Sequence, residues 1–93
     1  MALSNNAEWQ GEFAESQAFL TDSLALAREL GDAYHIARAL KGLGYTEHHQ
    51  GNLGRSQRLL EESLALFREI GDKRQIVGTL LNMAYIADLQ GSV

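Results

Sequence analysis

The feature that most constrains this chain is an internal repeat of 40 residues. Residues 11–50 align with residues 51–90 without a gap, and 16 of the 40 aligned positions hold the same residue. A repeat period of about 20–50 residues is typical of stacked repeat proteins, in which each unit buries its apolar face against its neighbours. Residues 1–10 align with residues 41–50, and we interpret them as the remnant of a preceding repeat unit. We therefore expect residues 1–93 to form a single domain of two repeat units, 11–50 and 51–90, behind that remnant.

Each unit is expected to contain two helices. In the second unit, apolar residues recur at steps of three and four, which is the spacing of one helix face, and no segment alternates as a strand does. Turns of one to three residues bring neighbouring helices into antiparallel contact. The predicted fold is therefore all-α. The predicted helices are residues 2–9, 12–30, 33–49, 52–70 and 73–90.

The predicted turns have a local physical basis. Gly31-Asp32 and Gly71-Asp72 each pair a glycine, which ends a helix in the left-handed conformation, with an aspartate that caps the next helix. Gly51-Asn52 is expected to do the same. Gly11-Glu12 is a weaker copy of this signal.

The chain resembles the tetratricopeptide repeat family. The positions that match the family pattern are Leu40, Leu43, Gly44, Gly51, Ser56, Leu60 and Ser63. The 40-residue period is similar to the long-helix repeats of LuxR-type and MalT-type transcription regulators and of signalling ATPases. The resemblance implies a right-handed solenoid of antiparallel helix pairs that binds a peptide or protein partner without catalysis. The alternative it implies is a sensor or regulatory part of one of those larger regulators.

Two departures from the family pattern involve polar residues. Serine stands where the family often has alanine, and its hydroxyl can bond to the backbone without preventing close packing. Glu47 lies inside the helix pair, where the other unit has Ala87. Either a nearby base such as Arg58 neutralises Glu47, or that helix pair is looser than usual.

In the family's arrangement, helices 33–49 and 73–90 line a concave groove. The groove residues that this implies are Arg38, Lys41, Tyr45, His48, His49, Asn82, Tyr85 and Asp88. Aromatic residues and arginine are frequent anchors of binding surfaces, and the Asn82 amide can hydrogen-bond to a peptide backbone. The alternative is that Tyr45 and Tyr85 simply complete the packing between helices.

Composition and spacing argue against several other functions. The chain has no cysteine and a net charge of −4, so we expect no thiolate metal site and no direct binding to nucleic acid. Adjacent His48 and His49 point about 100° apart on a helix, which is unsuited to a shared metal ion. Gly42-Leu43-Gly44 lies within a predicted helix, so its small residues are expected to permit close helix packing. We expect no catalytic residues, no cofactor and no metal.

The location and the assembly of the protein can also be predicted. No apolar run is long enough to cross a membrane and the start lacks a secretory pattern, so we expect a cytoplasmic protein. The last predicted helix has an apolar face without a following helix to cover it. Its residues expected to mediate self-association are Ile76, Leu80 and Met83, with Ala87 beside them. A symmetric homodimer through this face is the predicted assembly. The alternative is a head-to-tail contact between the acidic first third of the chain and the half that contains Arg55, Arg58, Lys73 and Arg74. We favour the twofold contact because it closes on itself, whereas a head-to-tail contact propagates.

Overall fold

The computed structural model describes residues 2–91 of the chain, and it describes side chains over residues 11–88. The predicted domain also includes residues 1, 92 and 93, which lie outside this part. The described residues form four helices and no strand, which confirms the all-α prediction. The helices are α1 (Ala2–Leu30), α2 (Ala33–His49), α3 (Leu53–Ile70) and α4 (Lys73–Gly91).

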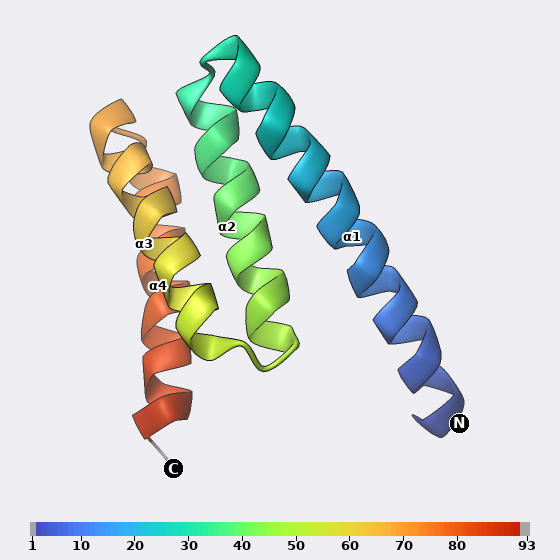
Figure 1. Cartoon of the computed structure of the whole chain (residues 1–93). Helices are drawn as coiled ribbons and strands as arrows, with labels where there is room; N and C mark the ends of the chain where they lie inside the picture. The colour runs from blue at the N-terminus through green and yellow to red at the C-terminus, as the bar shows by residue number, and fades with distance from the viewer. Residues whose placement is uncertain (1, 92–93) are drawn as a thin grey trace.

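The helices pack side by side in chain order, as in a helical-repeat solenoid. α2 packs against α1 on one side and α3 on the other, α3 packs against α4, and α2 also touches α4. Figure 1 shows α1 diverging from α2 toward its N-terminal end, so that its first residues extend past the turn between α2 and α3. The N-terminal part of α1 therefore lies away from α2.

Two of the turns have the predicted glycine–aspartate structure. Gly31 and Gly71 have φ angles of +67° and +80°, in the left-handed region that favours glycine. Asp32 Oδ1 accepts a hydrogen bond from the His35 backbone N–H at 3.1 Å, and Asp72 Oδ1 accepts one from Gln75 at 3.1 Å. The His35 backbone hydrogen bond, together with one from the His35 ring, lowers the pKa of Asp32. Both aspartates thus cap the helices that follow them.

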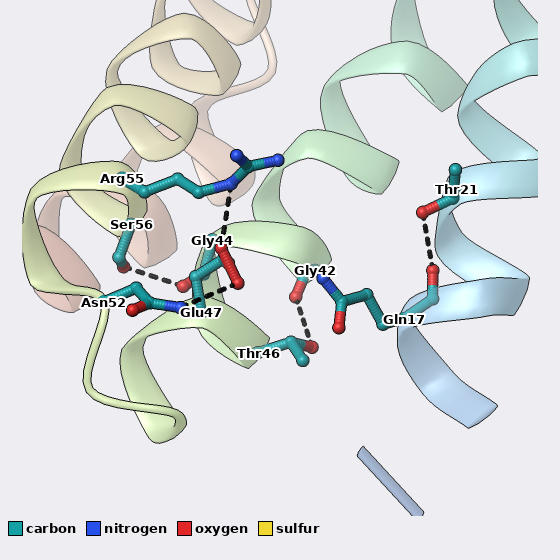
Figure 2. Close-up of polar contacts among 9 residues, drawn as sticks. All are labelled: Gln17, Thr21, Gly42, Gly44, Thr46, Glu47, Asn52, Arg55 and Ser56. Atoms are coloured by element: carbon teal, nitrogen blue, oxygen red, sulfur yellow. Dashed lines mark hydrogen bonds and ion pairs between the residues drawn. The ribbon is translucent and has the colours of Figure 1, made fainter. Parts of the chain in front are cut away.

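The turn between α2 and α3 is stabilised differently from the prediction. Gly51 has a φ angle of +88°, but the Asn52 side chain does not cap α3. Instead, Asn52 Nδ2 donates to Glu47 Oε1 at 3.3 Å, and Arg55 Nε lies 2.8 Å from Glu47 Oε2 (Figure 2). Glu47 is buried, with 4% of its surface exposed. The base that neutralises it is Arg55 rather than Arg58, and the helix pair closes around the carboxylate.

The predicted turn at Gly11 is wrong, because α1 continues through it. Gly11 is not among the described glycines with positive φ. The sequence around it also lacks the groups that stabilise the later turn, since Glu12 and Glu15 stand where Asn52 and Arg55 stand. Ala7 stands where Glu47 stands, so all three members of the group that closes the later turn are absent here. The predicted helices over 2–9 and 12–30 are therefore one helix.

The contact between α2 and α3 is the most extensive among the described helices. A Cβ atom added to Gly44 would lie 2.9 Å from Leu60 Cγ, which confirms that the small residues of this segment permit close packing. The Ser56 hydroxyl donates to the Gly44 carbonyl and the Ser63 hydroxyl to the Ala37 carbonyl, both at 2.7 Å (Figure 2 draws the first). The two serines thus link neighbouring helices. The side chains that fill this core are Leu40, Leu60, Leu64, Phe67, Thr79 and Ile86.

Candidate functional site

Five of the eight predicted groove residues surround one cavity. Its volume is about 330 Å³, and it lies where the C-terminal half of α2 faces α4. The residues that line it are Tyr45, His48, His49, Leu60, Asn82, Tyr85 and Ile86. Leu60 and Ile86 are almost fully buried, whereas Tyr45 and Tyr85 are 54% and 59% exposed. The cavity therefore has an apolar floor and an aromatic rim that is open to solvent.

A row of rings extends from α1 across α2 to α4 beside this cavity. The rings of Phe13 and His49 are nearly parallel, with their centroids 5.6 Å apart. The centroids of the Tyr45 and His49 rings are 4.4 Å apart. His48 meets His49 at 5.0 Å and Tyr85 at 5.6 Å, both edge to face. Such contacts stabilise ring orientations beyond their burial alone. We call these five residues the ring row.

The surroundings of His48 favour its uncharged form. Burial lowers the pKa of His48 below 6.5, and the neighbouring His49 lowers it further. A neutral imidazole presents one nitrogen donor and one acceptor. With the amide of Asn82, this gives the cavity a pair of polar groups that can both donate and accept hydrogen bonds.

The structure places the other three predicted groove residues outside this cavity. Lys41 Nζ donates to Gln75 Oε1 at 3.1 Å, which links α2 to α4. The Arg38 guanidinium lies 5.9 Å from the centre of the Tyr34 ring. Asp88 is exposed on α4, three residues after Tyr85. The predicted groove is thus divided into an aromatic part near the α2–α3 turn and a basic part nearer the start of α2.

A second, larger cavity lies between α1 and α2. Its volume is about 460 Å³. The residues that line it are Leu20, Ser23, Leu26, Ala27, Leu30, Asp32, His35, Arg38 and Ala39. Leu26 and Leu30 are 60% and 80% exposed, so the α1 wall of this cavity is apolar and largely open. The sequence analysis did not identify it.

The predicted self-association residues differ in exposure. Leu80 is 41% exposed, whereas Ile76 and Met83 are half-buried. The apolar residues of α4 that are most exposed are Val77, Leu80, Leu81 and Tyr85. The open apolar side of α4 is therefore centred on residues 77, 80, 81 and 84 rather than on residues 76, 80 and 83.

The sequence analysis missed three residues of the aromatic part of the groove. Leu60 and Ile86 form the cavity floor, and their apolar character at core spacing is the signal that would have placed them near Tyr45. Phe13 was not among the predicted groove residues. The continuous helix α1 brings Phe13 against His49.

No three histidine or acidic side chains in the described part of the chain are placed to hold a metal ion together. Within residues 2–91, no helix combines the length and apolar character that a membrane span requires.

Comparison with known proteins gives one match. The sequence model of the tetratricopeptide repeat family matches residues 1–69. No curated protein and no solved structure matches the chain. The family match covers α1, α2 and nearly all of α3.

Proposed function

Because this chain belongs to the tetratricopeptide repeat family, we propose that it is a protein-interaction module whose groove between α2 and α4 binds a peptide segment of a partner protein. The observation that supports this most strongly is the cavity of about 330 Å³ with an apolar floor and two exposed tyrosines at its rim. Exposed aromatic side chains beside an apolar pocket are frequent anchors at protein interfaces. The proposal involves no catalysis.

The chemistry of the groove indicates what kind of segment would fit. An apolar side chain of the partner would enter the cavity and contact Leu60 and Ile86. The Asn82 amide would hydrogen-bond to the backbone of the segment, since it can donate and accept at once. Arg38 is exposed further along α2 and would favour an acidic residue on the same segment.

Selection from a random peptide library displayed on phage tests this proposal. Peptides selected on the wild-type chain are expected to share an apolar anchor residue. Their affinity for the double variant Tyr45→Ala, Tyr85→Ala is expected to fall by at least about tenfold, because loss of anchor residues typically costs 1–2 kcal/mol or more.

The matched control is Ile70→Ala. Ile70 is also an exposed apolar residue, at 41% exposure, but it lies at the end of α3 away from the cavity. It should leave peptide affinity unchanged. Selected peptides that bind the double variant as well as the wild type would contradict the proposed site, provided that circular dichroism shows both chains equally helical.

A further inference from the structure

The two repeat units provide a template for how a helix covers α4. α3 covers the side of α2 that contains Ala37 and Gly44, and Ser63 and Ser56 donate hydrogen bonds to the carbonyls of these two residues. Ala37 is fully buried by this packing. The 40-residue shift maps this side of α2 onto the side of α4 that contains Val77, Leu80 and Ala84.

That side of α4 is open within the described residues. Val77 is 56% exposed and Leu81 is 65% exposed, and Ala84 is also exposed. Ala37 and Gly44, the equivalents of Val77 and Ala84, are buried under α3. α4 therefore has the surface of a helix that packs against a partner like α3.

α1 has the complementary surface. Ser16, Leu20 and Ser23 are the same residue types as Ser56, Leu60 and Ser63, which are all fully buried in α3. In α1, both serines are exposed. The cavity of about 460 Å³ lies beside this surface, and its lining residues Leu20, Ser23 and Ala27 correspond to Leu60, Ser63 and Phe67. α1 is thus a copy of α3 without a helix in the place that α2 occupies.

We propose that this chain associates head to tail, with α1 of one copy packing on α4 of the next in the register that α3 adopts on α2. In that register, Ser23 and Ser16 face the carbonyls of Val77 and Ala84, and α4 fills the cavity of about 460 Å³. Phe19 meets Leu80 and Met83, because its equivalent, Leu59, lines a hollow with Leu40 and Leu43.

The charges of the chain agree with this register. Within the chain, Arg28 of α1 lies 3.7 Å from Glu62 of α3. In the proposed contact, α4 takes the place of α2 and α1 of the next copy takes the place of α3. The position of Arg28 is then occupied by Arg68 of one copy, and that of Glu62 by Asp22 of the next, so one positive and one negative charge still face each other. Residues 1–32 also have a net charge of −5 and residues 33–93 of +1, which favours contact between the two ends.

The contact is heterologous, so it replaces the twofold dimer expected from sequence. Two different surfaces meet, one from α1 and one from α4, and each copy keeps one of each free for the next. The mass of the wild-type chain should therefore rise continuously with concentration, without a plateau at the dimer. Ala84 stands where Gly44 permits the close approach of Leu60, so this contact is expected to be weaker than the one within the chain.

Two single variants, mixed together, test the proposal by multi-angle light scattering. Val77→Asp places a charge on the α4 surface and Phe19→Asp on the α1 surface; both residues are more than half exposed, so the fold should be preserved. Each variant alone should remain at 10.3 kDa at concentrations where the wild type associates. Their mixture should form a one-to-one complex that grows no further, because only one intact pair of surfaces remains.

The matched control is Ala25→Asp. Ala25 is exposed on α1, and its equivalent, Ala65, is exposed even though α3 is packed on both sides. This variant should associate like the wild type. Reversing one charge by Asp22→Arg should weaken association about two- to fivefold at low salt, and Asp22→Arg with Arg68→Asp should restore it.

Three outcomes would overturn the proposal. The first is a wild-type chain that stays monomeric throughout a concentration series into the high micromolar range. The second is a Phe19→Asp variant that still dimerises alone, which would indicate a twofold contact between α4 helices. The third is the absence of a complex in the mixture of the two variants.

Discussion

Glu47 shows how a single side chain can determine the geometry of a turn. Its carboxylate is buried beneath the α2–α3 turn, where it bonds to Asn52 and pairs with Arg55, a side chain that is 64% exposed. A buried carboxylate without partners is unfavourable, because it loses its hydration. The three residues together therefore stabilise the turn.

Removing either Arg55 or Glu47 from this ion pair should lower the free energy of unfolding by different amounts. Arg55→Ala is expected to lower the free energy of unfolding by about 1–3 kcal/mol, because it leaves the Glu47 carboxylate buried and unpaired. Glu47→Ala should cost less, since it removes the buried charge and gives the residue found at position 87. Urea denaturation of both variants and of the double variant measures the difference.

Arg58→Ala is the control for this pair. It removes a neighbouring arginine that is exposed, so stability should change by less than about 0.5 kcal/mol. A loss of stability in this variant equal to that of Arg55→Ala would contradict the specific role of Arg55.

His48 should make stability depend on pH. Its pKa in the folded state is lowered from 6.5 by burial and by His49, so the unfolded chain binds the proton more readily. The contribution of neutral His48 to the free energy of unfolding should therefore be fully present above pH 6.5 and should decrease as the pH falls below that value. Urea denaturation at several pH values measures this, and His48→Gln should reduce the slope between pH 6.5 and the lowered pKa. An unchanged slope would show that His48 does not titrate differently on folding.

At the scale of helices, α1 differs most from its counterpart in the repeat. Residues 11–30 align with residues 51–70, yet Gly11 lies within a helix while Gly51 lies in a turn. A helix continues by default where nothing stabilises its end, and the groups that close the later turn are absent around Gly11. The equivalent glycines of the two repeat units, Gly11 and Gly51, thus have different conformations.

Substitution of Gly11 tests the continuity of α1. Gly11→Ala should raise stability by up to about 1 kcal/mol, because alanine favours a helix interior and no atom lies within 4 Å of the added methyl group. Gly51→Ala should lower stability, because alanine is strained at a φ of +88°. Thermal unfolding followed by circular dichroism compares the two, and a loss of stability in Gly11→Ala would indicate a turn at that position.

At the scale of the whole molecule, burial increases toward the middle of the helix stack. Leu60 is fully buried between α2, α3 and α4, whereas its repeat equivalent, Leu20, is partly exposed. Leu20 packs on α2 through Gly42, but the opposite side of α1 is open. Identical residues in the two units therefore contribute unequally to the core.

The two leucines should differ accordingly on truncation. Leu60→Ala is expected to cost about 2–5 kcal/mol, because it leaves a cavity in the middle of the stack. Leu20→Ala should cost at least about 1 kcal/mol less, since part of its side chain is already exposed. Urea denaturation gives both values, and equal losses would mean that another copy buries Leu20 under the conditions used.

The sequence alone determined the helices that follow residue 32, their antiparallel arrangement and the repeat family, because these depend on local spacing and on short-range turns. Helix-ending glycines and capping aspartates act within a few residues, so Gly31-Asp32 and Gly71-Asp72 were predicted correctly. The tyrosines, His48 and Asn82 followed from the family arrangement, and the structure places these four residues around one cavity.

Only the tertiary structure decided which partners these side chains meet. Arg55 rather than Arg58 reaches Glu47, and Phe13 joins the ring row, because contacts between helices depend on crossing angle and rotation as well as on spacing. The absence of a turn at Gly11 was likewise decided by tertiary contacts, because the turn at Gly51 is closed by Glu47, Asn52 and Arg55 acting together. The open surface of α1, and which residues of α4 are exposed, emerged only when the buried residues of α2 and α3 could be compared with their exposed equivalents, because burial is a property of neighbours and not of residue type.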